Sequence, residues 1–337
     1  MKRILSLILA VALSIGTLAL ASCDKNDTIK INPDKENYVV GILQLAPHPA
    51  LDAATEGFMD ALEAKLAEAG RTVEFKVQNA QGDSNTCTTV VNSFVADDVD
   101  MIMANATAAL FAAANATLTI PVLGTSITEY GVALEIDDFD GTVGGNISGT
   151  SDLAPLTEQA QMMIDTLGLD NTKKVGLLYC SSELNSQYQV DVVGAYLSER
   201  GISVEHFKFA DSNELQTICQ NAASKVDAIY VPTDNVVASN AGIINNVCEP
   251  ANIPVFAGEE GICSVCGYAT LSISYYNIGK KTGEMAAKIL LGQENISTMP
   301  IAYDASPVKK YNKEICDKLG IDTDALDAQG YVAIATE

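Results

Sequence analysis

The sequence VGIL at residues 40–43 recurs as VGLL at residues 175–178, and this repeated stretch decides the fold. Each copy is followed by a polar loop and then by a helical stretch, which ends at Gly70 in the first copy and at Gly201 in the second. A glycine after the last helical residue supplies the left-handed cap that ends a helix. Short apolar strands that alternate with amphipathic helices are typical of parallel α/β sheets. The repeat therefore predicts two similar α/β units in one chain.

Two further pairs of segments repeat in the same order. The sequence VDMI at 99–102 matches VDAI at 226–229, and IPVLG at 120–124 matches IPVFAG at 253–258. We predict an α/β fold of two doubly wound parallel-sheet lobes joined by crossing hinge strands, with a ligand cleft between them. The predicted boundaries are residues 38–146 plus 275–304 for lobe 1 and residues 147–274 plus 305–337 for lobe 2.

The first 22 residues have the pattern of a bacterial lipoprotein signal peptide rather than of a folded segment. Two basic residues precede an apolar run over residues 4–20, and the small residues Ala21 and Ser22 stand directly before Cys23. In such signals the cysteine becomes the lipidated first residue. We therefore expect Cys23 to anchor the mature chain outside the cytoplasm, on the cell membrane, with residues 23–37 as a tether. The alternative is an uncleaved transmembrane helix, and the polar residues that follow Cys23 argue against it.

The composition indicates an acidic protein of two domains. With 337 residues, 48% of them hydrophobic, the chain is long enough to form two separate cores. A formal net charge of −23 would repel nucleic acid and anionic lipid surfaces. We expect a monomer with no nucleic-acid partner.

The cysteines do not predict a metal site. Eight cysteines minus Cys23 leave seven, so at least one is free or paired between chains. The sequence CSVC at residues 263–266 has the spacing of a zinc or redox motif, but no second Cys/His pair at metal spacing accompanies it. We interpret it as a structural or incidental pair, and we predict no metal and no cofactor.

The loops that follow the predicted strands contain no Lys or Arg, the usual partners of phosphate and dicarboxylate ligands. They carry hydroxyls, amides and a few carboxylates, a mixture that suits a small zwitterion such as an amino acid. Hydroxyls and helix amides near Thr107, Ala108 and Ser126 can donate to its carboxylate. Asp234 and Glu260 can accept from its ammonium group.

These candidates, together with His48, also have ordinary structural interpretations. His48 stands between two prolines and suits stacking or a hydrogen bond to ligand, although a lone loop histidine is more often a surface residue. Loop Ser and Thr residues most often cap helices, and Asp234 is placed to cap the helix that follows it. Glu260 and its neighbour Glu259 can form a solvated acidic pair.

Motifs between residues 38 and 319 resemble those of one known family. They are HPALD at 48–52, NAQGD at 79–83, SSELNS at 181–186, PTDN at 232–235 and YYNIG at 275–279. In these motifs the chain resembles the ABC-transporter substrate-binding proteins, whose members include tryptophan- and tyrosine-binding lipoproteins. The resemblance implies a type I periplasmic-binding fold, no catalysis, an ABC permease as membrane partner and an aromatic amino acid as ligand. It also implies that Gln44, Thr107, Ser126, Asn185 and Asn235 hold that ligand.

Two other functions stay open at this point. A ligand-sensing subunit of a membrane receptor would use the same binding event. A hydrolase in the cleft would need a general base, and the chain offers only His48 and His206 and no Gly-x-Ser-x-Gly elbow. The sequence therefore favours capture of a small ligand over catalysis.

Overall fold

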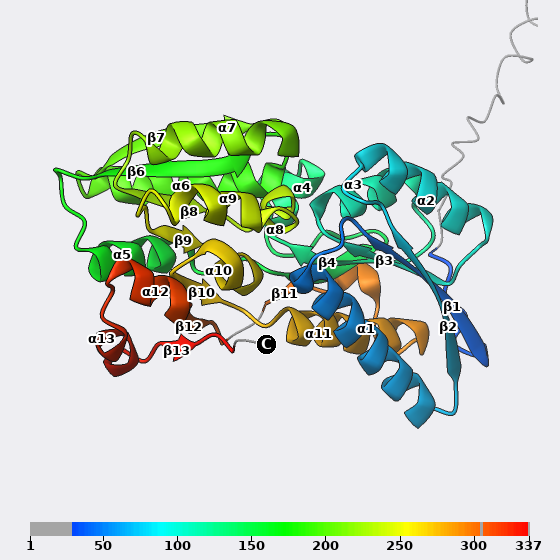
Figure 1. Cartoon of the computed structure of the whole chain (residues 1–337). Helices are drawn as coiled ribbons and strands as arrows, with labels where there is room; N and C mark the ends of the chain where they lie inside the picture. Colours follow the sequence, from blue (N-terminus) through cyan, green and yellow to red (C-terminus); the bar gives the residue numbers. More distant parts are fainter. Residues whose placement is uncertain (1–28, 304–305, 336–337) are drawn as a thin grey trace, which may run out of the picture.

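The computed structural model describes residues 29–303 and 306–335, which form two α/β lobes that lie side by side (Figure 1). The predicted signal peptide, Cys23 and the first part of the predicted tether lie outside the described residues. In the part of the chain that is described, no helix has both the length and the apolar character needed to cross a membrane.

Lobe 1 is built on a six-stranded sheet with the order β11-β5-β4-β3-β1-β2, and its paired strands run parallel. The strands are β1 (Asn37–Gln44), β2 (Thr72–Asn79), β3 (Met101–Asn105), β4 (Val122–Ile127), β5 (Ile147–Ser151) and β11 (Ala302–Tyr303). The helices are α1 (Pro49–Glu68), α2 (Ser84–Ala96), α3 (Thr107–Ala116), α4 (Tyr130–Leu134), α11 (Tyr275–Leu290) and the 3-10 helix η1 (Ile296–Thr298).

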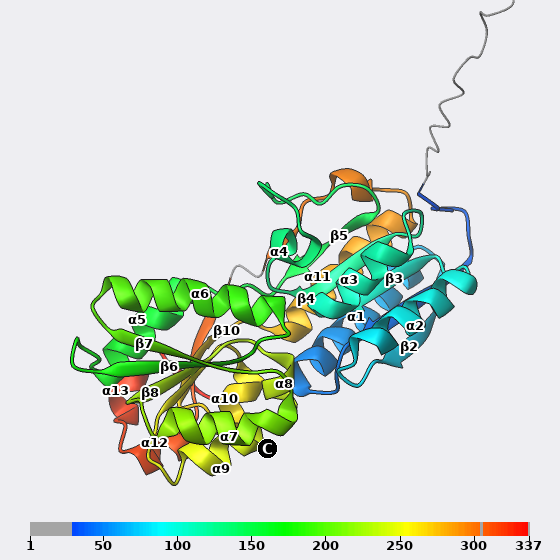
Figure 2. The ribbon, with the colours of Figure 1, turned by 90° about the horizontal axis from the view of Figure 1, so that it is seen from above.

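Helices cover both faces of this sheet (Figure 2). On one face Val40 and Ile42 of β1 pack in a core with residues of α1 and α11, and on the other Leu43 packs in a core with residues of α2 and α3. A strand that is buried on both faces needs apolar residues in succession, which explains the run VGIL. Gly41 is part of that run because a side chain there would collide with the ring of Phe94 on α2.

Helices α1 and α11 approach each other unusually closely because three glycines face the contact. A Cβ atom at Gly57 would collide with the backbone of Tyr276, and one at Gly279 would collide with the backbone of Ala54. Gly283 meets the backbone of α1 in the same way. Close backbone approach therefore accounts for the glycines of these two helices and fixes α11 on lobe 1, although it lies far from α1 in the sequence.

Lobe 2 is built on a seven-stranded sheet with the order β13-β12-β10-β9-β8-β6-β7. Its strands run parallel except that β12 is antiparallel to β10. The strands are β6 (Lys174–Cys180), β7 (Ser203–Phe209), β8 (Ala228–Val231), β9 (Val255–Ala257), β10 (Ala269–Ser272), β12 (Val308–Tyr311) and β13 (Val332–Ala333). The helices are α5 (Leu156–Leu167), α6 (Leu184–Glu199), α7 (Ser212–Ala223), α8 (Asn235–Ala238), α9 (Ala241–Cys248), α10 (Glu260–Cys266), α12 (Lys313–Leu319) and α13 (Thr323–Ala328).

The two lobes repeat one topology, which confirms the predicted fold class. The order β2-β1-β3-β4-β5 in lobe 1 matches β7-β6-β8-β9-β10 in lobe 2. The glycines predicted to end the first helix of each unit have positive φ angles, 70° at Gly70 and 80° at Gly201. In both sheets the strand order reverses beside the first strand, and in such folds ligands bind at this reversal, beyond the carboxyl ends of the strands.

The chain crosses between the lobes three times, and the first crossing lies later than the boundary expected at residue 146. Strand β5 pairs with β4 and belongs to lobe 1, so the chain crosses after Ser151. The end of the segment at the expected boundary is held in lobe 1, because the Asn146 amide donates to the carbonyls of Thr117 and Ile120. The second crossing lies between β10 and α11, and the third lies between β11 and β12.

Candidate functional site

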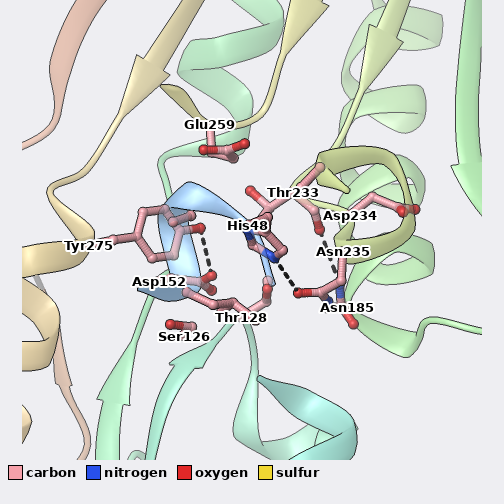
Figure 3. Close-up of a pocket in the computed structure, with 13 residues that line it drawn as sticks. His48, Ser126, Thr128, Asp152, Asn185, Thr233, Asp234, Asn235, Glu259 and Tyr275 are labelled. Carbon is pink, nitrogen blue, oxygen red and sulfur yellow. Dashed lines mark hydrogen bonds between the residues drawn. The ribbon is translucent and has the colours of Figure 1, made fainter. Parts of the chain in front are cut away.

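A cavity between the lobes, which we call the inner cavity, is lined by residues that follow the carboxyl ends of strands (Figure 3). Lobe 1 contributes the ends of β1 and β4, lobe 2 contributes the ends of β8 and β9, and two crossing segments complete the wall. The lining residues are His48, Ala50, Leu51, Ser126, Thr128, Asp152, Asn185, Thr233, Asp234, Asn235, Ala238, Glu259 and Tyr275.

Ser126 occupies a strained position at the end of β4. Its φ angle is 55°, and the pairing of β4 with β5 shifts register between Gly124 and Ile127. The Ser126 hydroxyl is buried and has no hydrogen-bond partner among the described residues. Backbone strain together with an unsatisfied polar group is a combination found at ligand sites, because it stabilises nothing in the protein alone.

Asp152 and Tyr275 join two of the crossings. The Tyr275 hydroxyl donates to Asp152 Oδ2 at 2.9 Å, while Asp152 Oδ1 is buried without a hydrogen-bond partner in the described structure. Burial raises the pKa of the Asp152 carboxyl, and the side chains of Tyr275 and Thr128 only partly oppose this. The inner cavity therefore contains one carboxylate oxygen that can accept a hydrogen bond from a ligand.

His48 connects the two lobes directly. The His48 Nε2 atom lies 3.2 Å from Asn235 Oδ1, and the Asn235 amide nitrogen donates to Glu183 Oε2 at 2.7 Å. Glu183 thereby turns the Asn235 oxygen toward the imidazole, so Nε2 carries the proton and Nδ1 is an acceptor. Nδ1 is buried without a partner among the described residues, and burial lowers the pKa of His48, which favours the neutral ring.

The two carboxylates from lobe 2 are already engaged within their own lobe. Burial raises the pKa of Glu259 to about 7, and burial together with the Glu183 carboxylate raises the pKa of Asp234 to about 7. Both oxygens of each group accept hydrogen bonds. The donors are Cys180 N, Ser186 Oγ and Val237 N for Asp234, and Gly261 N and Ile262 N for Glu259.

The inner cavity is narrow, and a wider groove adjoins it. The inner space is about 300 Å³, but only about 10 Å³ of it admits the centre of a water molecule, room for about one water. The groove between the lobes, which we call the outer groove, has a volume of about 820 Å³ on the same measure. It shares Asn185 and Asn235 with the inner cavity. No Lys or Arg of the described residues lines either space.

The structure brings five of the nine predicted ligand residues into the inner cavity. They are His48, Ser126, Asn185, Asp234 and Asn235. Thr107 and Ala108 line the outer groove instead, at the start of α3. Ala106, which precedes them, has φ 89° and leaves α3 without a side-chain cap, so the helix amides are open to the groove.

Gln44 and Glu260 line neither space, which corrects their predicted role. The Gln44 amide donates to the carbonyl of Ala46 and to Asp52 Oδ1, and its oxygen accepts from the Thr55 hydroxyl, so its hydrogen bonds are used inside lobe 1. The Glu260 carboxylate pairs with Lys310 Nζ at 2.5 Å. In the adjacent acidic pair it is Glu259, read from the sequence as solvated, that is buried in the cavity wall.

Asp152 and Glu259 were the functional candidates that sequence reasoning missed. Asp152 directly follows β5. Because the first part of lobe 1 was expected to end at residue 146, the sequence did not indicate that a strand of lobe 1 ends just before Asp152. Thr128 was missed with it, and Tyr275 stood out only as part of the YYNIG motif at residues 275–279. The available signal for Asp152 was an acidic residue directly after a short β-type run.

Comparisons with known proteins give a consistent picture. The sequence model of a family described as ABC transporter substrate binding protein matches residues 39–326. A tyrosine-binding protein of Clostridioides difficile is 35% identical over 309 residues, which cover 89% of this chain and 87% of that protein. A Streptococcus pneumoniae ABC domain solved in complex with L-Trp is 30% identical and superimposes with a TM-score of 0.80 over 88% of this chain and 100% of the other.

A second solved structure superimposes less well on this chain. The open, ligand-free form of a substrate-binding protein with adhesive properties from Clostridium difficile is more similar in sequence, at 35% identity, but has a TM-score of only 0.68 over 89% of this chain and 100% of the other. A rotation between two conserved lobes lowers a global score in this way. The narrow inner cavity and the contact of His48 with Asn235 agree with a closed arrangement of the lobes.

Proposed function

The chain belongs to the family of ABC transporter substrate-binding proteins, and from that premise we propose that it captures a zwitterionic amino acid, an aromatic one, for an ABC importer. Proteins of this family act outside the cytoplasm and bind small molecules. The ligand, the direction of transport and the lipid anchor of this particular chain are parts of the proposal.

One observation carries it: the inner cavity holds three buried polar atoms that lack partners among the described residues. They are Ser126 Oγ, Asp152 Oδ1 and His48 Nδ1. An unsatisfied buried polar atom costs about 1–3 kcal/mol, so a ligand head group that satisfies all three, admitted when the two lobes move apart, removes that cost. Two of the atoms are acceptors suited to an ammonium group, and the Ser126 hydroxyl can donate to a carboxylate.

The absence of a counter-cation supports an ammonium ligand. Asp152, Asp234 and Glu259 stand around the cavity, and no Lys or Arg of the described residues lines it. Several helices begin at the cavity and at the outer groove, and their positive ends stabilise the ligand carboxylate beside these acids. A dicarboxylate or a phosphate would meet three acidic side chains with no basic partner.

We place the aromatic side chain of the ligand toward the outer groove. The inner cavity is too small for a ring, whereas the outer groove is large and contains the half-exposed side chains of Phe111 and Leu184. Burial of a ring against such side chains contributes about 1.5–3 kcal/mol. The names of the Clostridioides difficile and Streptococcus pneumoniae relatives support tyrosine and tryptophan as the first ligands to test.

The proposal includes no catalysis. The Ser126 hydroxyl has no hydrogen bond to His48 or to any other described residue, so the serine has no general base. His48 Nε2 is occupied by Asn235. The unpaired Ser126 hydroxyl and the His48 ring held by Asn235 are instead suited to forming hydrogen bonds with a ligand.

The deciding experiment is a thermal-shift screen of the twenty amino acids on the mature protein without its lipid anchor. A ligand at 100 times its Kd adds about 2.7 kcal/mol of stability, which is readily detected. We expect tyrosine, tryptophan or phenylalanine to raise the melting midpoint and alanine to leave it unchanged. If sugars or nucleosides stabilise the protein and amino acids do not, the assignment is wrong.

We propose that Cys23 carries the lipid anchor. The support is the LASC sequence at residues 20–23 and the polar segment that follows. Expression with a labelled fatty acid is expected to label the wild-type protein and to leave Cys23→Ser unlabelled, with the mutant released from membranes. Equal labelling of both proteins would place the lipid on another residue, and a lack of label on both would rule the lipid out.

A further inference from the structure

Two buried cysteines on neighbouring helices of lobe 2 face each other. Cys219 on α7 and Cys248, the last residue of α9, have sulfur atoms 3.7 Å apart. Both belong to the core beneath these helices, and their side chains are 0% and 2% exposed. This is a pair of thiols from segments that are separate in the sequence.

The pair differs from the other cysteines of lobe 2 in its hydrogen bonding. The thiols of Cys180, Cys263, Cys266 and Cys316 each donate to a backbone carbonyl oxygen. In the described structure Cys219 and Cys248 contact only each other in this way. The thiols of the CSVC sequence are therefore ordinary core groups, while Cys219 and Cys248, which the sequence spacing does not pair, lie where they can bond to each other.

We propose that Cys219 and Cys248 are the disulfide site of this protein. Each thiol loses one hydrogen, the two sulfurs form one bond, and the two electrons and two protons pass to a disulfide oxidant of the cell envelope or the medium, which becomes a dithiol. A bond of about 2.05 Å requires the sulfur atoms to approach by less than 2 Å. The position of Cys248 at the end of its helix makes that shift a local one.

The bond forms while the lobe folds rather than afterwards. Exchange requires a thiolate that an oxidant can reach, and both thiols are inaccessible in the folded lobe. The hydrogen bond with Cys219, followed by burial, raises the pKa of the Cys248 thiol well above its ordinary value. Once formed, the bond is shielded from reductants by the same burial, so it behaves as a structural disulfide.

Peptide mapping tests the pairing directly. The mature protein is refolded in a glutathione redox buffer, alkylated with iodoacetamide in denaturant without reduction, and cut with trypsin at Lys225 and with Glu-C at Glu214 and Glu259. These cuts separate Cys219 from Cys248 and both from Cys263. We expect one disulfide-linked pair of peptides, 215–225 joined to 226–259. Alkylation of both cysteines, or linkage of either one to Cys266, overturns the proposal.

Stability measurements give a second test that does not depend on the ligand. A disulfide closing this loop constrains the unfolded chain, so reduction by dithiothreitol in denaturant before refolding should lower the melting midpoint by about 5–10 °C. The effect should persist in Cys266→Ala and in Cys87→Ala, whose thiol is buried in lobe 1. It should vanish in Cys219→Ala. Equal sensitivity of Cys219→Ala and wild type to reduction contradicts the pairing.

The two proposals can fail separately. Helices α7 and α9 contribute no residue to the inner cavity, so Cys219→Ala should bind amino acids as tightly as wild type. A protein that binds no amino acid can still contain the disulfide.

Discussion

The two walls of the inner cavity differ in how their polar groups are satisfied. On the lobe 2 side, Asp234 and Glu259 accept hydrogen bonds on both oxygens from their own lobe. On the lobe 1 side and at the first crossing, Ser126, His48 and Asp152 each keep one buried polar atom without a partner among the described residues. From this difference we propose that lobe 2 supplies a preorganised wall and that the lobe 1 side supplies the groups that bind the ligand.

This division has an energetic reason. The desolvation of an unpaired buried group is costly, and the protein bears that cost only where a ligand later removes it. Carboxylates that accept all their hydrogen bonds from their own lobe keep their orientation whether or not ligand is present. Mutations on the two walls should therefore affect different quantities: affinity on the lobe 1 side and stability on the lobe 2 side.

The largest expected effect is on affinity, in Asp152→Asn. The substitution removes the negative charge that faces the ligand ammonium and leaves that cation buried without its partner. We expect about a 100-fold loss of affinity, ~3 kcal/mol, measured by calorimetry with the amino acid found in the screen.

The matched control is Glu260→Gln, which removes a carboxylate that pairs with Lys310 and does not line the cavity. Its affinity should stay within twofold of wild type. If both variants bind as wild type does, Asp152 is not a ligand group and the contrast between the walls disappears.

The next effect is on stability, in Asp234→Asn. A neutral amide has one acceptor oxygen where the carboxylate has two, and its NH2 group would face the donors Cys180 N or Val237 N. We expect a loss of about 1–3 kcal/mol in the free energy of unfolding at pH 8, read from denaturant titration. Affinity should change by less than threefold. A large loss of affinity with no change in the free energy of unfolding would show that Asp234 of lobe 2 contacts the ligand directly.

A smaller effect on affinity is expected for Ser126→Ala. The mutant loses one donor to the ligand carboxylate, which corresponds to about a tenfold weaker Kd. The unliganded protein should be at least as stable as wild type, because the buried hydroxyl has no partner to lose and its removal ends the cost of burying it. Ser93→Ala, on the exposed face of α2, provides the control for a serine of the same lobe. Loss of stability without loss of affinity in Ser126→Ala would assign the hydroxyl a structural role.

The fold could be predicted from the sequence because it depends on local patterns. The strand that opens each lobe is buried on both faces, so it is continuously apolar and visible in VGIL and VGLL. The helix ends at Gly70 and Gly201 were visible because only glycine adopts their backbone conformation easily. The crossing after Ser151 was not visible, since whether β5 pairs with β4 or with a strand of lobe 2 depends on the tertiary arrangement.

The site could be predicted only in part for the same reason. The loops after the strands gave His48, Ser126 and Asn235, because strand ends converge at one edge of a sheet. Which of two adjacent acids turns inward could not be read from the sequence: Glu259 caps α10 from the cavity wall, and Glu260 turns to Lys310. The unsatisfied state of Asp152 is a property of three-dimensional packing and has no local signal.

The smallest expected effect is a pH dependence of affinity that comes from the lobe 1 side. Burial raises the pKa of Asp152, so as the pH is lowered this carboxylate gains a proton earlier than an ordinary aspartate does and loses its attraction for the ligand ammonium. Burial lowers the pKa of His48, so its ring stays neutral to a lower pH than an ordinary histidine does and repels the ammonium only once it is protonated. Both changes have the same sign, and we expect affinity to fall as the pH is lowered from 7.5 to 5.5.

The contrast between the walls decides how that pH dependence responds to mutation. Glu259 also titrates in this range, with its pKa raised to about 7, but its oxygens accept from the amides of Gly261 and Ile262. Because the folded protein holds that proton at a higher pH than the unfolded chain does, Glu259 makes stability fall as pH rises toward 7. Glu259→Gln should remove this contribution and leave the similar one from Asp234. The slope of affinity with pH should persist in Glu259→Gln and flatten in Asp152→Asn. Affinity is measured by calorimetric titration at pH 5.5, 6.5 and 7.5. If the slope flattens in Glu259→Gln and persists in Asp152→Asn, Glu259 of lobe 2 rather than Asp152 is the carboxylate that binds the ligand.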